Sequence, residues 1–258
     1  DIYDKDALIE EFLQKNSFYV PQAQQKIKKA WYFLCEKCGD RKRAYGSPYY
    51  LHCLRIAHIL ADGEFDDDCV CAGILHCTGN LGVTEAEITA EFGEAVSRII
   101  AGTAKFSHLP VNSKTLHQAD AIRKMLFAMA DDVRVIFVKI ADRLDRIRNI
   151  KSLEPKEQRV LASEIIDIWA PLADRLGMQT EKNEFEDLSL KYTNPDAFQQ
   201  IKAVIAQKKD ERASYLQKAV STIQAEANKA GISVSITRRA KHFYSIYQKM
   251  RKRNKEPG

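Results

Sequence analysis

Four residues whose side chains can bind a metal ion lie at or near apolar, helix-like segments of this 258-residue chain. They are His52, His76, Cys77 and Asp142. His76 directly follows the apolar run 70–75, and Asp142 directly follows the mostly apolar run 133–141. Helical proteins build metal centres from histidines and carboxylates that project from several buried helices. A buried histidine or aspartate needs a polar partner, and a divalent cation can be that partner.

Taken one at a time, these residues have a simpler interpretation. A single histidine on an apolar helix is usually a hydrogen-bonded core residue. The tetrapeptide Ala-Asp-Arg-Leu occurs twice, at 141–144 and 173–176, so Asp142 could instead belong to an ion-paired helix face. Spacing alone therefore leaves a metal site and an ordinary polar core both open.

A second group of candidate ligand-binding residues lies in the basic end of the chain. Residues 238–258 contain eight Lys/Arg and one acid, Glu256, so their net charge is 8 − 1 = +7. The net charge of the whole chain is +5, and the rest of the chain therefore carries 5 − 7 = −2. Lys241, Ser245 and Lys249 are four residues apart and so share one helix face, which suits a polyphosphate near a helix N-terminus. A solvated basic helix, or a nucleic-acid surface with interleaved aromatic residues, would explain the charge equally well.

All six cysteines lie in the first third of the chain, at positions 35, 38, 53, 69, 71 and 77. We expect reduced, mostly buried thiols in a cytoplasmic protein. Cys35-x-x-Cys38 invites a metal or redox interpretation, but the second CxxC of a zinc site is missing, since Cys69 and Cys71 have the wrong gap.

No apolar run approaches membrane-spanning length, so we expect no contact with a membrane.

Helical periodicity dominates the segments that must position these residues. Helices are predicted from about Ala7 and then at 21–38, 49–62, 67–77, 84–93, 94–104, 115–130, 132–150, 156–176, 180–192, 195–228 and 241–253. Pro171 should kink the helix at 156–176 or restart it. The only strand signal is the alternation of apolar and polar residues over 232–237. Because one strand cannot form a sheet, the end of the chain is predicted to begin an α/β domain that continues outside it.

Six motifs, in order along nearly the whole chain, resemble the RelA/SpoT family of alarmone enzymes. They are 46–52, 73–76, 138–144, 169–177, 184–189 and 238–250, and the last resembles the opening of the family's synthetase domain. The resemblance implies a mainly α fold. It predicts an HD-type hydrolase-like domain over 1–176. Residues 177–258 would then hold connecting helices and the first strand and helix of a nucleotidyltransferase-like synthetase domain.

In active family hydrolases, a manganese ion activates the water that removes the 3′-pyrophosphate of ppGpp or pppGpp. By position, its ligands here would be His52, His76, Cys77 and Asp142. Cys77 replaces an aspartate, and a thiolate favours softer metals such as zinc over manganese. Asn80 and Leu81 occupy the positions of an acidic pair that contributes to water activation, and neither side chain can take a proton from water. The metal and the hydrolase activity are therefore expected to be lost.

The resemblance also implies nucleotide contacts. Arg43 lies where the family packs an arginine on guanine, and with Asn149 it would form a vestigial guanine-nucleotide site. In the synthetase motif, Arg239 would pack on adenine, while Lys241, Ser245 and Lys249 would hold the ATP phosphates.

These expectations make the chain part of a GTP pyrophosphokinase of the stringent response, with a regulatory or structural pseudo-hydrolase domain. The chain alone should be inactive in synthesis and hydrolysis and need no cofactor, whereas the full-length synthetase would use Mg²⁺. ATP and GTP or GDP would be its substrates, with a possible ribosome contact through regions outside this chain. Two alternatives stay open: an active metal-dependent ppGpp hydrolase with an unusual cysteine ligand, and a ribosome- or nucleic-acid-binding module.

Overall fold

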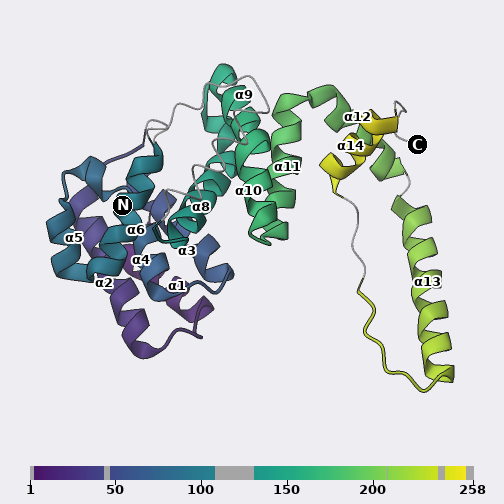
Figure 1. The fold of residues 1–258 in the computed structure, drawn as a ribbon, viewed down its shortest axis with the longest axis horizontal. Coiled ribbons are helices and arrows are strands. Elements are labelled where there is room, and N and C mark those ends of the chain that lie inside the picture. Colours follow the sequence, from purple (N-terminus) through teal and green to yellow (C-terminus); the bar gives the residue numbers. More distant parts are fainter. Residues whose placement is uncertain (1–2, 44–46, 108–130, 208, 238–241, 254–258) are drawn as a thin grey trace.

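A computed structural model describes residues 3–43, 47–107, 131–207, 209–237 and 242–253, and all regular elements in these ranges are helices (Figure 1). The α-helices are α1 Lys5–Lys15, α2 Pro21–Cys38, α3 Tyr49–Asp62, α4 Asp67–Leu75, α5 Glu85–Phe92, α6 Glu94–Ser107, α8 Arg134–Arg148, α9 Pro155–Glu164, α10 Ala170–Arg175, α11 Gln179–Thr193, α12 Pro195–Gln207, α13 Lys209–Lys229 and α14 Phe243–Arg253. Short 3-10 turns cover Thr78–Leu81 (η1) and Ile150–Ser152 (η2), and a π-helical turn covers Ile165–Trp169 (η3). The predicted helix at 115–130 lies outside the described residues.

Helix α4 forms the centre of the first half of the chain. It packs against α2, α3, α6 and α8, and its residues from Cys69 to Leu75 are all buried. Such burial on every side explains why this segment is a continuous apolar run instead of an amphipathic one. Asp66 caps the helix by accepting a hydrogen bond from the backbone N–H of Cys69 at 2.8 Å.

The end of α4 differs from the prediction in a way that matters for the site. The helix was predicted to run to residue 77, but it ends at Leu75 with His76 as its C-cap, and the chain then forms the turn η1. His76 and Cys77 are therefore placed at a helix end, where side chains can point past the helix toward its neighbours. The capping box predicted at Thr84 and Glu87 is present and begins α5.

The predicted interruption at Pro171 is confirmed. Helix α9 passes into the π-turn Ile165–Trp169, and α10 begins immediately before the proline. Proline has no N–H to donate to the preceding turn, so the regular hydrogen-bond ladder cannot pass through this position. A π-turn is one of the few ways in which a helix can absorb such a break without ending.

The last part of the chain extends away from this helical body (Figure 1). Helix α14 packs against α11 and α12, partly through stacking of Phe243 on Phe198, whereas α13 contacts mainly α12. The predicted helix 195–228 is seen as two helices, α12 and α13. The strand predicted over 232–237 is wrong, because these described residues have no regular structure. No second strand is available among the described residues to pair with this segment, and a strand without a partner leaves its backbone hydrogen bonds unmade.

Gly73 provides a test of how closely α3 and α4 must approach. A Cβ atom on Gly73 would lie 2.5 Å from a Leu60 methyl carbon and 3.2 Å from one of Ile56. We expect Gly73→Ala to cost about 1–3 kcal/mol through overpacking and to regain about 1 kcal/mol of helix propensity. Urea denaturation should show a net loss of about 1 kcal/mol. Gly79→Ala is the control, because its Cβ would meet nothing within 4 Å; equal stability of the two variants would contradict the packing argument.

Candidate metal site

Four side chains from three segments converge at one place inside the helical body. His52 lies on α3, His76 and Cys77 follow α4, and Asp142 lies on α8. One ligand atom from each of His52, His76 and Cys77 lies within 4.8 Å of the others. Asp142 Oδ1 is 3.2 Å from His52 Nε2 and 3.9 Å from His76 Nε2. The structure thus brings together all four residues singled out from the sequence.

The two imidazole rings are held through their Nδ1 atoms. His52 Nδ1 lies 2.6 Å from Asp145 Oδ2, and His76 Nδ1 donates to the carbonyl of Gly73 at 2.7 Å. In both rings this leaves Nε2 directed at the same spot. Holding one ring nitrogen by a carboxylate or carbonyl is how proteins orient a histidine for a metal ion.

Asp145 is an orienting group that the sequence interpretation missed. Its buried carboxylate contacts His52 and also accepts a hydrogen bond from Arg55 Nε at 2.5 Å. The spacing of Asp142 and Asp145 was the available signal, because residues three apart share a helix face.

Asp142 is also tied to a second polar network. Arg143 Nη1 donates to Asp142 Oδ2 at 2.6 Å, and Arg143 Nε donates to Glu164 at 2.9 Å. The indole N–H of Trp169 donates to the same Glu164 oxygen at 2.7 Å, and the Arg143 guanidinium lies over the Trp169 ring. One carboxylate oxygen of Asp142 is therefore engaged by an arginine, which leaves Oδ1 facing the histidines.

Electrostatics reflect this dense arrangement of charges. Burial lowers the pKa of His52, but the Asp142 and Asp145 carboxylates outweigh it and raise the pKa to about 10. Burial raises the pKa of Asp142, but His52 and the Arg143 cation hold it well below its ordinary value. The hydrogen bond from Cys53 outweighs burial and, with the neighbouring imidazoles, holds the pKa of the Cys77 thiol well below its usual range. The cluster therefore favours a thiolate at Cys77 and an ionised carboxylate at Asp142.

The cluster does not fit manganese well. Mn²⁺ prefers oxygen ligands, and here a sulfur replaces one carboxylate while the other is partly neutralised by Arg143. Asn80 and Leu81 stand on η1, with Asn80 exposed and Leu81 packed partly against the core. Neither can supply a carboxylate. No hydrolytic step through a manganese ion can be derived from these residues.

A basic hollow of about 350 Å³ lies beside the cluster and shares Asp145 with it. Its charged lining residues are Arg43, Arg55, Arg146, Arg148, Lys151 and Asp145. Arg43 and Asn149, which the resemblance assigns to a guanine nucleotide, both line this hollow. The amide of Asn149 donates to the backbone carbonyl of Asp145 at 2.8 Å, so it is already engaged within the protein.

The other five thiols are buried. All six cysteines are free, and Cys35 and Cys38 are buried. Burial raises the pKa of Cys35 to about 12 and also raises that of Cys38, so both favour the neutral thiol. Within the described residues, the group of His52, His76 and Cys77 is the one that could hold a metal ion.

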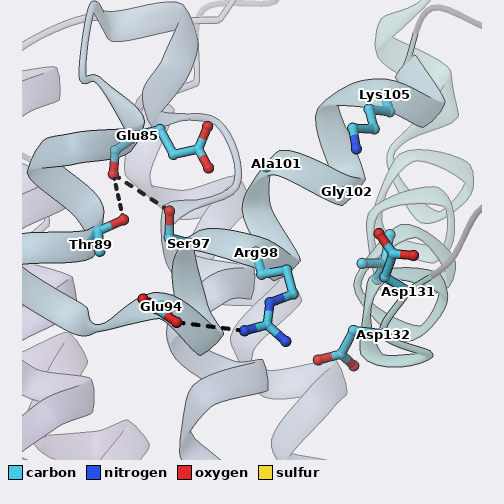
Figure 2. A pocket seen from close by; sticks show the side chains of 11 residues that line it. Glu85, Thr89, Glu94, Ser97, Arg98, Ala101, Gly102, Lys105, Asp131 and Asp132 are labelled. Carbon is cyan, nitrogen blue, oxygen red and sulfur yellow. Dashed lines mark hydrogen bonds and ion pairs between the residues drawn. The ribbon is translucent and has the colours of Figure 1, made fainter.

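A second hollow, of about 360 Å³, lies between α5, α6 and the start of α8 (Figure 2). Glu94 and Arg98, one turn apart on α6, form an ion pair at its edge, and the hydroxyls of Thr89 and Ser97 donate to the carbonyl of Glu85. It contains no histidine or cysteine and shares no lining residue with the metal cluster.

Of the predicted ATP-binding residues, the structure describes Ser245 and Lys249. Both lie on α14; the Ser245 hydroxyl is 3.0 Å from a ring nitrogen of His242, and Lys249 is exposed one turn further on. Arg239 and Lys241 lie outside the described residues.

No helix in the described part of the chain is both long and apolar enough to cross a membrane.

Comparisons with known proteins agree with this geometry. The model of the HD domain family matches residues 30–179, a range that holds all four clustered residues. The chain belongs to the HD domain family, and its HD region is of the RelA/SpoT type.

The chain is similar to several longer enzymes. It is 35% identical to a guanosine-3′,5′-bis(diphosphate) 3′-pyrophosphohydrolase of Aquifex aeolicus over 95% of the chain and 35% of the relative. It is 36% identical to a GTP pyrophosphokinase of Myxococcus xanthus over 87% of the chain and 30% of the relative. It is 34% identical to the GTP pyrophosphokinase rsh of Brucella ovis over 93% of the chain and 32% of the relative. The chain thus spans about a third of the length of these relatives.

The role of Asp145 can be tested by its removal. Asp145→Ala should destabilise the protein by about 3 kcal/mol, because it leaves buried His52 without its carboxylate partner. Asp62→Ala is the matched control, since Asp62 pairs with Lys15 at the surface and should cost less than about 1 kcal/mol. Guanidinium unfolding of both variants measures the difference. Losses of equal size would mean that Asp145 does not anchor the cluster.

Proposed function

We propose that this chain is part of a (p)ppGpp synthetase and that its HD domain is a regulatory or structural pseudo-hydrolase. The observation that carries the proposal is that Cys77, Asn80 and Leu81 stand where the family resemblance places acidic residues, while His52, His76 and Asp142 are still brought together by the helices. A metal-dependent hydrolase needs a held ion, a polarised water and a group that accepts its proton. Here Asn80 and Leu81 provide no carboxylate to polarise the water or to accept its proton.

The basic hollow supports a binding role without chemistry. Of its five cationic side chains, Arg55 pairs with Asp145 and Arg148 with Glu184, and the added charge of Arg43, Arg146 and Lys151 favours an anionic ligand. In our proposal a guanine nucleotide enters this hollow, with Arg43 against its base, and is held there unchanged. Asp145, which lines the hollow and contacts His52, would connect the ligand to the cluster.

A series of direct contacts leads from this hollow toward the synthetase-like end of the chain. Arg148 of α8 makes two hydrogen bonds to Glu184 of α11, at 2.6 and 2.7 Å. Further along α11, Glu186 contacts His242 at 2.8 Å, and Asp187 accepts from the backbone N–H of Tyr244 at 2.9 Å. This connection supports regulation of an adjoining synthetase domain, because a shift of α8 would be transmitted to α14.

For the whole protein, we propose ATP and GTP or GDP as substrates, Mg²⁺ as the ion used in synthesis, and a cytoplasmic location. Residues 1–176 would form the HD-type domain, and 177–258 the connecting helices and the beginning of the synthetase domain. A ribosome contact would have to come from regions outside this chain.

The purified chain should not hydrolyse ppGpp when Mn²⁺ is added. Cys77→Asp alone should not restore the activity, because Asn80 and Leu81 still provide no carboxylate to activate water. For the unchanged chain and for Cys77→Asp, the measurement is the release of pyrophosphate from ppGpp, detected by chromatography. Turnover on the order of one per second or faster would overturn the proposal and favour the alternative of an active hydrolase with a thiolate ligand. A relative that hydrolyses ppGpp, assayed in the same buffer, is the positive control.

In the full-length protein, Lys249→Ala and Lys241→Ala should each lower ppGpp synthesis about tenfold or more, because a charged hydrogen bond to phosphate is worth about 1.5–3 kcal/mol. Transfer of radiolabel from ATP to GTP is the measurement. Lys229→Ala on α13 is the control, since Lys229 is exposed and pairs only with nearby Glu226. Unchanged synthesis in the two variants would make the basic helix a surface feature or a nucleic-acid contact.

A further inference from the structure

The four clustered side chains supply the donor atoms of a different metal site from the one that the HD family implies. They are two imidazole nitrogens, one sulfur and one carboxylate oxygen, from His52, His76, Cys77 and Asp142. Nitrogen and sulfur donors with at most one oxygen are typical of zinc, whereas manganese is bound mainly by oxygen. The sulfur is the donor that distinguishes the two.

One atom in the cluster lacks a hydrogen bond. His52 is only 1% exposed, and its Nε2 atom, although 3.2 Å from Asp142 Oδ1, makes no hydrogen bond of acceptable geometry. A buried imidazole nitrogen without a well-aligned hydrogen bond is costly, even beside a carboxylate. A metal ion bound to Nε2 would remove this cost, and the Asp145 contact at Nδ1 already holds the ring in the orientation that it requires.

Three of the distances between donor atoms lie close to those around a tetrahedral ion. Bonds of ~2.0–2.3 Å to zinc imply separations of roughly 3.3–3.6 Å between neighbouring ligand atoms. The observed separations are 2.9 Å for Cys77 Sγ to His76 Nε2, 3.2 Å for His52 Nε2 to Asp142 Oδ1, and 3.9 Å for His76 Nε2 to Asp142 Oδ1. Shifts of less than about 1 Å, well within side-chain adjustment, would equalise these three. Asp142 is not within 4.8 Å of all three other donors, so binding of an ion would also have to bring its carboxylate closer to Cys77.

Charge and coordination number point the same way. One thiolate and one carboxylate neutralise a divalent cation, so such an ion could be buried here without a net charge. Four protein ligands leave no open position for water, which is the mark of a structural zinc site and not of a catalytic one.

We infer that His52, His76, Cys77 and Asp142 bind a thiophilic divalent ion of the zinc class in a closed, structural site, in preference to manganese. This inference is independent of the proposed function, because a silent domain can fold with or without an ion.

Cobalt(II) is a suitable probe because a thiolate bound to it gives a charge-transfer absorption in the near ultraviolet. The untagged chain, freed of metal by a chelator, should take up one Co²⁺ with this absorption, and equimolar Zn²⁺ should displace it. A hundredfold excess of Mn²⁺ should not. Mass spectrometry of the intact protein under native conditions gives the stoichiometry, and thermal unfolding should shift upward with Zn²⁺.

Two variants of Cys77 identify the sulfur. Cys77→Ser should abolish the charge-transfer absorption, and Cys77→Asp should abolish it and reduce the preference for Zn²⁺ over Mn²⁺ at least tenfold. Cys38→Ala is the matched control, because it removes a buried thiol outside the cluster and should change neither readout. Circular dichroism establishes that each variant is folded.

Three results would overturn the inference. The first is no stoichiometric binding of Co²⁺ or Zn²⁺, which would mean that a protonated His52 bridges Asp142 and Asp145 in place of an ion. The second is a thiolate absorption that survives Cys77→Ser but is lost in Cys38→Ala, which would place the ion at Cys35 and Cys38. The third is equal affinity for Mn²⁺ and Zn²⁺.

Discussion

The buried carboxylate of Asp142 imposes the constraint on which the rest of this domain depends. An ionised carboxylate inside a helical core is unstable unless cations or hydrogen-bond donors surround it. Here α3 supplies His52, the end of α4 supplies His76, and the neighbouring Arg143 supplies the guanidinium. Each of these groups must approach within a few ångströms, so the packing of α3, α4 and α8 is tied to the polar cluster as firmly as to the apolar side chains around it.

This dependence separates the cluster residues by their place in the fold. Cys77, Asn80 and Leu81 lie on or beside the short turn after α4. His52 and Asp142 are in helix interiors, where the loss of either would leave its partner buried and unpaired. Stability of the fold alone is therefore a sufficient reason for the inner residues to be present.

Much of the fold could be predicted from the sequence because helical periodicity is local. The bounds of α2 and α3, the capping box at Thr84 and the break at Pro171 all follow from neighbouring residues. The strand over 232–237 could not be judged in this way, because a strand needs a partner and alternation alone does not supply one.

The candidate site was only partly predictable. The four clustered residues were found through motifs. Asp145 was signalled only by its spacing from Asp142, and Glu164 acts through a contact between helices that no local pattern reveals.

The π-turn at Ile165–Trp169 has a geometric effect on everything that follows it. In an α-helix, residues five apart point roughly 140° away from each other, so Trp169 could not reach Glu164. The wider turn brings them onto one side, where the indole donates to the carboxylate that also holds Arg143. It also puts the helix after Trp169 about one residue out of phase with the helix before it. The phase of α10, against which α11 packs, is therefore that of a helix restarted after this turn and beside Pro171.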